Sequence, residues 1–333
     1  MNSARPQSPL LSRQRILDEC LTAATLAPSS HNTQPWHFRV QRGHIDLIVD
    51  RTRALPSNDP HDRELTISCG AALFNLRVAA AAHSWHALVE ERPFPEDEDL
   101  LARIVLCSGM ESGIQDAAAL AAAIGERRTY RKRFTGASVD QHTIDTLVLA
   151  AESERCFAAP ITSLTERERA AILIGEADEL LWNDAVWRRE ISSWMHPRRR
   201  NEGFGVPGLS RAAAQLVART FDLGNGVAAH DQQILESAPL LLIIGSPGDE
   251  VEDWLHTGQA LQRVLLTACA AGLQASFLNQ PIHFDRLRSR LREIVPRALT
   301  PQLMLRLGRP TEALAPATRR PVAEVVDADW LEG

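Results

Sequence analysis

Two Ala-rich segments constrain the fold of this chain more than any other feature. One begins at Gly70 and the other at Gly258, and over 13 residues they agree at the glycine and at four further positions. Both have small residues over much of their helical surface, and glycine lets two backbones approach closely. A repeat at this long period predicts two similar halves packed around these helices. Chance similarity between Ala-rich helices is the alternative.

The pattern of apolar residues predicts helices and strands in both halves. Ser138 with Gln141, and the segment 165–168, have the residue types of helix N-terminal caps. We therefore expect an α+β protein, with halves at 12–125 and 126–326 that each have a central mixed or antiparallel sheet flanked by helices. Helices are expected at 12–25, 63–83, 138–151, 165–182, on to 194, around Gly258 and at 284–294, and strands at 38–40, 45–49, 86–91, 102–107, 240–244 and 303–307.

The charge balance disfavours two classes of partner. The chain has 333 residues, a formal net charge of -6 and a pI of about 6.0. No basic field therefore favours nucleic acid or anionic lipid. We expect no nucleic-acid partner and no membrane association.

The cysteines and histidines give no sign of a disulfide framework or a metal site. The five cysteines are scattered, odd in number and form no C-x-x-C pair. His83 and His86 lack further ligands nearby in the sequence. We expect a reducing, cytoplasmic location and no bound metal.

A polar loop between a predicted helix and a predicted strand stands out at 27–36. It reads Ala-Pro-Ser-Ser-His-Asn-Thr-Gln-Pro-Trp. Its short hydrogen-bonding side chains and two prolines suit a flat, polar-edged ligand. An ordinary turn that ends a helix is the alternative.

The wording of this loop resembles a flavin-binding motif. Pro-Ser-Ser-X-Asn-X-Gln-Pro-Trp is similar to the flavin-contacting loop of the FMN-dependent nitroreductase family. The resemblance implies that Pro28, Ser29, Ser30 and Asn32 line the isoalloxazine ring and ribityl chain of FMN.

A basic segment at the start of the second half could bind an anion. Arg127, Thr129 and Arg131 alternate by two, so in an extended segment they face one side. Guanidinium and hydroxyl groups bind a phosphate by charge-assisted hydrogen bonds. A solvated basic strip is the alternative.

The same segment resembles the start of the nitroreductase domain, where Arg-Arg-Ser/Thr-X-Arg precedes a phenylalanine. That resemblance implies that Arg127 and Thr129 contact the FMN phosphate and that Arg131 lies near N1 and O2 of the flavin. Arg133 is an extra residue before Phe134 relative to the commonest spacing.

Three shorter matches imply further cofactor contacts. The first lies before the strand predicted at 240–244, and a lysine that is common there in the family is missing. The second is an Asn-Gln-Pro where the backbone of the family passes the flavin N5. The third is a C-terminal Arg-Arg-Pro. The residues at these positions are His230 and Gln233, Asn279 and Gln280, and Arg319 and Arg320.

The two motifs are divided between the halves. The polar loop occurs only in the first half and the Arg-rich segment only in the second. Ordinary family members are homodimers whose sites draw these motifs from different subunits. This chain is similar to the single-chain, twin-repeat (Acg-like) branch, which implies a monomeric pseudo-dimer with one FMN.

The resemblance implies an oxidoreductase that takes hydride from NAD(P)H and reduces a nitroaromatic, quinone or similar flat acceptor. The flavin carries the chemistry, so no catalytic side chain is expected. A non-enzymatic protein that stores FMN is the alternative, and a scaffold without flavin is a weaker one. The Arg-, Gly- and Pro-rich stretch at 197–209 is either a lid or a plain linker.

Overall fold

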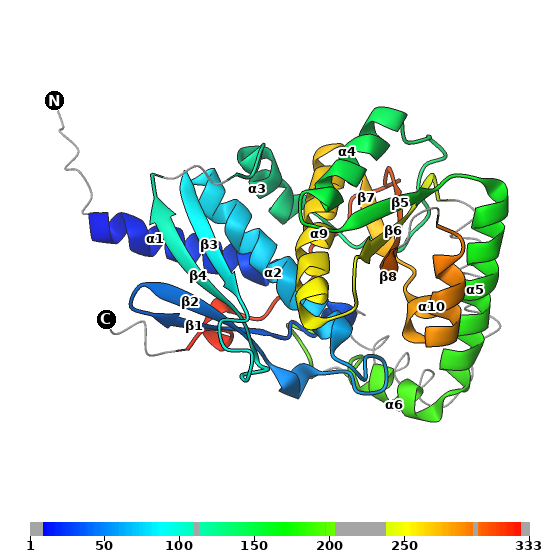
Figure 1. The fold of residues 1–333 in the computed structure, drawn as a ribbon, viewed down its shortest axis with the longest axis horizontal. Helices are drawn as coiled ribbons and strands as arrows, with labels where there is room; N and C mark the ends of the chain where they lie inside the picture. The colour runs from blue at the N-terminus through cyan, green and yellow to red at the C-terminus, as the bar shows by residue number, and fades with distance from the viewer. Residues whose placement is uncertain (1–8, 110–112, 197, 204–237, 296–298, 328–333) are drawn as a thin grey trace.

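The computed structural model describes residues 9–109, 113–196, 198–203, 238–295 and 299–327. These residues form an α+β fold with two four-stranded sheets (Figure 1). All strand pairings within the two sheets are antiparallel. The sequence left mixed and antiparallel sheets open, and the second form is the one observed.

The first sheet is built by the first half of the chain and has the strand order β1-β2-β4-β3. Strands β1 and β2, predicted at 38–40 and 45–49, form a hairpin with Gly43 in its turn at a φ of +106°. A side chain is rarely accommodated at such a φ. The elements are α1 (Pro9–Thr25), η1 (Ser30–Asn32), β1 (Trp36–Gln41), β2 (His44–Val49), η2 (Arg51–Arg53), α2 (Arg63–Ala82), β3 (Trp85–Glu91), β4 (Leu100–Ser108) and α3 (Ala117–Glu126).

The second sheet has the order β5-β6-β8-β7, which repeats the order of the first. This agreement is consistent with a twin-repeat arrangement. The exact boundaries at 12–125 and 126–326 stay a prediction. The elements are α4 (Gln141–Glu152), β5 (Phe157–Ile161), α5 (Leu164–Asn183), α6 (Ala185–Ser193), β6 (Leu240–Ser246), α9 (Val251–Ala270), β7 (Gln274–Phe277), η3 (Gln280–His283), α10 (Asp285–Arg292), β8 (Thr300–Gly308) and η4 (Val322–Glu324).

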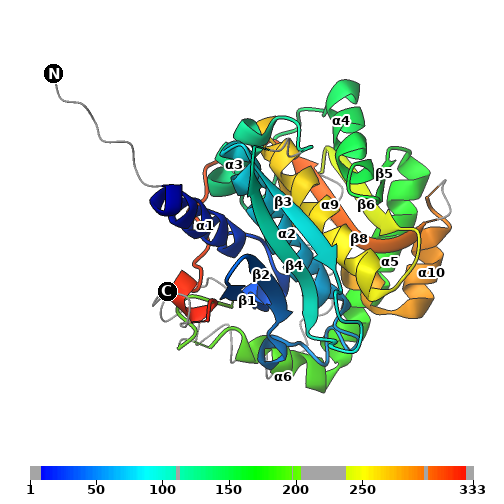
Figure 2. The same cartoon turned by 60° about the vertical axis from the view of Figure 1, so that its left-hand side comes forward.

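Helices α2 and α9 lie side by side between the two sheets (Figures 1 and 2). They touch at the two predicted glycines. A Cβ atom on Gly70 would lie 2.3 Å from the carbonyl oxygen of Leu255, and one on Gly258 would lie 2.0 Å from that of Ile67. The predicted packing of the halves around these helices is therefore confirmed.

The close contact exchanges side chains between the two cores. Leu255 of α9 is fully buried in the core of the first half, and Ile67 of α2 is buried in the core of the second half. Helix α2 is long and apolar enough to span a membrane by composition, but 83% of that window is buried inside the protein. It is the central helix of the fold.

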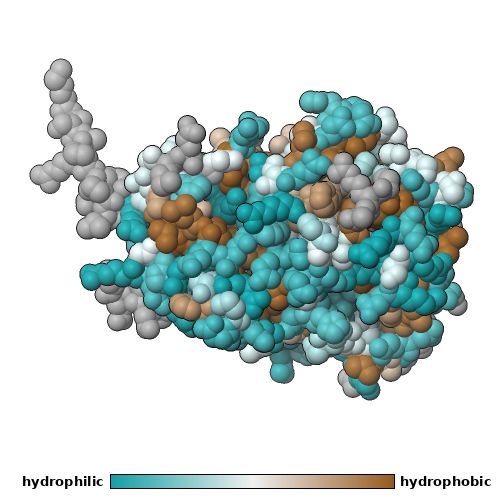
Figure 3. Space-filling model, viewed as in Figure 1, coloured by the Kyte–Doolittle hydropathy of each residue, from teal (hydrophilic) through white to brown (hydrophobic). Residues whose placement is uncertain are grey.

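Strand β6 is covered on both faces. Leu240 and Leu242 pack in the core that includes α4 and α9, whereas Leu241 and Ile243 pack in the core that includes α5 and α10. A strand buried on both faces reads as a continuous apolar run, as the sequence predicted here. On the face shown in Figure 3, hydrophobic residues form separate patches among hydrophilic ones.

The cap assignments for two helices were wrong. Asp140, not Ser138, caps α4, because its carboxylate accepts a hydrogen bond from the amide of Thr143 at 2.9 Å. Helix α5 begins earlier than expected, with a capping box between Ser163 and Glu166. In both cases a neighbouring residue of equal capping ability is the one in position to cap.

The chain end returns to the first half. The amide of Phe38 donates to the carbonyl oxygen of Val325 at 2.8 Å, and the amide of Asp327 donates to that of Phe38 at 3.1 Å. Val325 and Val326 pack in the first core. The tail thus joins the two halves a second time.

The helix contact gives a stability prediction. Gly258→Ala should lower the free energy of unfolding by at least about 2 kcal/mol, because the added methyl group meets backbone atoms of α2. Gly175→Ala in α5 is the matched control, since a Cβ there meets nothing within 4 Å. That control should stabilise the protein by about 0.5–1 kcal/mol. Urea denaturation measures both, and equal effects would contradict the close helix contact.

Candidate functional site

Two connected cavities lie between the halves. One, here called the basic cavity, has a volume of about 200 Å³ and is lined by Arg127, Arg128 and Arg319. The other, the inner cavity, has a volume of about 170 Å³ and is lined by Glu64 and Asn279. The two cavities share the lining residues Pro28, Ser29, His31, Thr129 and Arg131.

The polar loop after α1 forms one wall, and its backbone is held in an unusual shape. His31, Asn32 and Gln34 have φ values of 50°, 55° and 54°. Such left-handed conformations cost about 1–3 kcal/mol each for residues other than glycine. Ser29 Oγ accepts a hydrogen bond from the amide of Gln34 at 2.9 Å, which closes the loop. The loop is therefore fixed before any ligand binds.

Asn32 uses its side chain to join three segments of the chain. Its Nδ2 donates to the carbonyl oxygens of Gly203 and Thr318 at 3.4 and 3.2 Å. Its Oδ1 accepts from Arg319 Nη1 at 3.2 Å. Asn32 lines the basic cavity, and it also ties the tail to the loop.

Four arginines line the basic cavity, and no carboxylate is among its described lining residues. Arg127 is only 6% exposed, and among the described residues no hydrogen-bond partner meets its Nε. Burial first, and then the nearby Arg319, lower the pKa of Arg127 to about 9. Burial first, and then the nearby Arg128, lower the pKa of Arg319 to about 10. An anion bound here would relieve both costs.

The inner cavity has apolar walls and polar ends. Leu261, Phe277 and Leu303 line it together with Arg131 and Asn279. Asn279 Oδ1 accepts from the amide of Met304 at 3.0 Å, which fixes the orientation of the side-chain amide. Apolar walls with a few placed polar groups are typical of sites for flat organic ligands.

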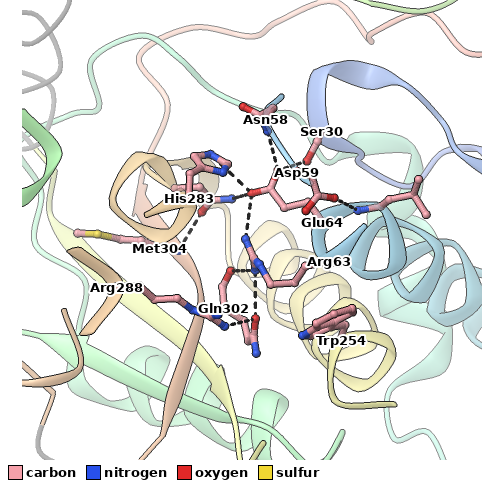
Figure 4. Close-up of polar contacts among 12 residues, drawn as sticks. Ser30, Asn58, Asp59, Arg63, Glu64, Trp254, His283, Arg288, Gln302 and Met304 are labelled. Atoms are coloured by element: carbon pink, nitrogen blue, oxygen red, sulfur yellow. Dashed lines mark hydrogen bonds and ion pairs between the residues drawn. The ribbon is translucent and has the colours of Figure 1, made fainter. Parts of the chain in front are cut away.

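A buried carboxylate, Glu64, lines the inner cavity, and Figure 4 shows its polar contacts. Glu64 Oε2 accepts from Ser30 Oγ at 2.6 Å, and Oε1 accepts from Asn279 Nδ2 at 3.1 Å. Burial opposes ionisation, but His283, Arg63 and the Ser30 hydrogen bond hold the pKa of Glu64 below its usual range. The carboxylate is thus ionised at neutral pH.

The two histidines beside Glu64 are neutral. Burial lowers the pKa of His31 to about 4, although Glu64 acts in the opposite direction. Burial also lowers the pKa of His283. At neutral pH the charged groups lining the inner cavity are therefore Glu64 and Arg131.

The structure brings most predicted contacts to these cavities. The loop residues Pro28, Ser29, Ser30 and Asn32, the basic residues Arg127, Thr129 and Arg131, and Asn279 and Arg319 all line them.

Two predicted contacts do not line either cavity. Gln280 lies in η3 outside both linings. The side chain of Arg320 instead joins the polar loop to the tail, because its Nη1 donates to the carbonyl oxygen of Gln34 at 3.3 Å and its Nη2 to that of Glu324 at 2.7 Å. His230 and Gln233 lie outside the described residues.

Part of the proposed lid can be placed. Of 197–209, only residues 198–203 are described. The amide of Gly203 donates to the carbonyl oxygen of Asn32 at 3.2 Å, and Gln34 Nε2 donates to that of Asn201 at 2.8 Å. This short piece therefore rests on the polar loop at the edge of the basic cavity. The lid interpretation stays a prediction.

Several lining residues were missed by sequence reasoning. In a regular strand Arg128 would point away from Arg127, and the sequence prediction assumed such alternation. The segment 127–131 instead forms a single bridge, between Thr129 and Ala275, and no continuous strand. Arg128 therefore also lines the basic cavity. Arg63 and Glu64 are adjacent charges at the start of a mostly apolar helix. This pattern is the sequence feature that could have indicated a buried polar site at the inner cavity.

Comparison with known proteins fits this arrangement. A family model described as the nitroreductase family matches residues 124–309. The chain belongs to the nitroreductase family. The model covers the Arg-rich segment, the second sheet and Asn279, whereas the polar loop lies before it.

Relatives that extend across both halves place the chain in the Acg-like branch of the nitroreductase family. Rv3131 of Mycobacterium tuberculosis, named as a candidate NAD(P)H nitroreductase, is 33% identical over 323 residues, covering 94% of this chain and 90% of the relative. Acg of the same organism is 27% identical over 316 residues, covering 93% and 95%.

A solved nitroreductase-like structure from Anabaena variabilis also matches both halves. It covers 92% of this chain and 90% of its own, with a TM-score of 0.54 and 10% identity. A likeness at this identity shows the fold alone. Together with the family model it confirms the expected nitroreductase-like fold.

The unpaired charge of Arg127 gives a prediction for the ligand-free protein. Arg127→Met should raise the free energy of unfolding by about 1–4 kcal/mol at pH 7, because it removes a buried charge that lacks a partner. Urea denaturation at pH 7 measures this.

Arg320→Met is the control, because that guanidinium is hydrogen-bonded within the fold and its loss should destabilise the protein. Inorganic phosphate should raise the Tm of the wild type more than that of Arg127→Met. Equal destabilisation by both substitutions would show that Arg127 has a structural partner and is not part of an anion site.

Proposed function

We propose that this chain binds one FMN between its halves and uses it to pass hydride from NAD(P)H to a nitroaromatic, quinone or similar flat acceptor. The observation that carries the proposal is the pair Arg127 and Arg319 in the basic cavity, whose described lining has no carboxylate, next to the inner cavity with Arg131 and Asn279. Membership of an oxidoreductase family supports the reaction class.

The basic cavity fits the phosphate end of FMN. A phosphate dianion would balance the positive charges of Arg127, Arg128 and Arg319. The Thr129 hydroxyl would add a neutral hydrogen-bond donor at the same wall. The orphan Nε atoms of Arg127 and Arg319 are donors that such an anion could satisfy. The residues present therefore fit this part of the cofactor.

The inner cavity fits the ring. Its apolar side chains suit the faces of a flat aromatic system, and Ser30, Arg131 and Asn279 suit the polar edge. When bound, FMN would supply hydride transfer, and Arg131 would stabilise negative charge that reduction adds to the ring. The protein would orient the two reactants and keep water away.

The corresponding place in the second half is filled, which supports one cofactor per chain. Where the polar loop follows α1, Glu154 follows α4. Its carboxylate is buried and accepts from Arg77 Nη1 at 2.6 Å and Arg263 Nη1 at 2.8 Å. Arg77 Nη1 also donates to Gln259 Oε1 at 2.6 Å. These arginines already have their anion, so a second phosphate has no unpaired cation there.

Other parts of the proposal follow from the fused arrangement. The α2 and α9 contact has buried the surface that two subunits would otherwise share, so we expect a monomer. The name of the relative Rv3131 favours NAD(P)H as donor. A cytoplasmic location agrees with the five cysteines, all of which are free thiols in the described residues.

The first test is flavin content followed by turnover. Purified protein should be yellow and release one FMN per chain, and anaerobic NAD(P)H should bleach it at a rate that supports turnover with a quinone. Two FMN per chain would contradict the filled second site. Bound FMN that NAD(P)H does not reduce would favour the alternative, storage of FMN, and colourless protein that stays colourless in FMN would reject both.

Substitutions of Arg127 and Arg131 should affect different properties of bound FMN. Arg127→Ala should weaken FMN binding by about 1.5–3 kcal/mol, the value of a charge-assisted hydrogen bond. Arg131→Ala should in addition shift the midpoint potential of bound FMN downward, because it removes a positive charge beside the ring. Fluorescence titration and spectroelectrochemistry measure the two quantities. Equal effects of both variants on both quantities would refute this division of roles.

A further inference from the structure

The inner cavity contains a charge that hydride transfer by a flavin does not call for. Glu64 stands in the first turn of α2 with a side chain only 5% exposed, and it lines the same cavity as Arg131. A buried carboxylate is costly unless several donors surround it. Its partners therefore indicate what it is kept for.

Four donors from both halves surround this carboxylate, and His283 lies beside it (Figure 4). In addition to Ser30 and Asn279, Asn58 Nδ2 lies 3.4 Å from Oε2, and Arg63 Nη2 lies 3.4 Å from Oε1. His283 Nε2 is 3.9 Å from Oε1. Arg63 is shared, because its Nη1 also donates to the carbonyl oxygen of Gln302 at 2.6 Å. Arg63 is the cation among these donors, and because its guanidinium is shared it offsets only part of the negative charge of Glu64.

The hydrogen bonds also decide what the neighbouring side chains can offer a ligand. Ser30 has one hydroxyl proton and gives it to Glu64 at 2.6 Å, so towards the cavity Ser30 can only accept. Asn279 directs its Nδ2 to Glu64 and its Oδ1 to the amide of Met304. Glu64 thus sets the polarity of one predicted flavin contact from each half.

We propose that Glu64 is a positioning and potential-tuning residue, whose buried negative charge opposes Arg131 and lowers the midpoint potential of FMN bound in the inner cavity. The inference rests on the proposed function. Reduction adds negative charge to the ring, and a like charge held in a water-poor cavity disfavours it. Glu64 and Arg131 then pull the potential in opposite directions.

A structural tie between the halves would not move the potential, so the test measures that quantity. Glu64→Gln keeps the size of the side chain and an acceptor for Ser30 but removes the charge. Its FMN should have a higher midpoint potential than the wild type, and it should bind reduced FMN more tightly relative to oxidised FMN. The double variant Glu64→Gln with Arg131→Gln should return towards the wild-type potential.

Glu154→Gln is the matched control. Glu154 is a buried glutamate with charged partners that lines neither cavity, so its loss should cost stability without moving the potential. Should Glu64→Gln fail to fold, Glu64→Asp draws the carboxylate away from Ser30 and should raise the potential to a smaller extent.

The ligand-free protein gives an independent measurement of the charge. Glu64 raises the pKa of both His31 and His283 against the effect of burial. In Glu64→Gln the NMR titrations of both histidines should therefore move to lower pH. Unmoved titrations would show that Glu64 is not ionised and would overturn the proposal.

The outcomes separate the two levels of the argument. Wild-type protein that binds no FMN rejects the proposed function and this inference with it. One FMN per chain with a potential that Glu64→Gln leaves unchanged or lowers rejects only the inference, and leaves Glu64 as a tie between the halves.

Discussion

The two halves of this molecule are held together by the close contact of α2 and α9 at Gly70 and Gly258. At Gly70 and Gly258 hydrogen atoms replace Cβ atoms that would lie 2.3 and 2.0 Å from the opposite helix, so the backbones of α2 and α9 are in contact. This approach lets Leu255 enter the first core and Ile67 the second. Because each core is completed by the other half, the two sheets behave as parts of one packed unit. Every contact across the cavities depends on that spacing.

The cavities inherit their character from this boundary. The first half contributes the fixed loop around Ser29 and the carboxylate of Glu64, and the second contributes Arg127, Arg131 and Asn279. Positive charge gathers at one end and negative charge at the other, with apolar side chains between them. A ligand that is anionic at one end, flat in its middle and rich in hydrogen-bonding edges matches this order. At the corresponding place in the second half, after α4, Arg77 and Arg263 are already paired with Glu154.

Local patterns carried the sequence predictions, and their failures have local physical causes. The helices, the Gly70 and Gly258 contact and the loop at 27–36 could be predicted, since each is encoded in a continuous stretch. Strands β5 and β7 were missed because they contain residues of low strand preference, two alanines and Pro160 in β5 and Gln-Ala-Ser in β7. Glu64 was missed because a charge in an apolar helix acquires its meaning only from donors such as Asn279, which is 215 residues away. Arg320 was predicted as a cofactor contact, but its Nη1 donates to the carbonyl oxygen of Gln34 at 3.3 Å.

The tail has a consequence for the order of events during synthesis. Arg319 reaches back to the carbonyl oxygens of Leu26 and Ala27 at 3.3 and 3.0 Å, so the wall of the basic cavity joins segments almost three hundred residues apart. Closing so long a loop needs both halves to be in place first. A nascent chain that has emerged only as far as the second sheet has the loop and Arg127 but lacks that wall. The wall of the basic cavity that Arg319 forms is therefore completed only after the tail has been synthesised.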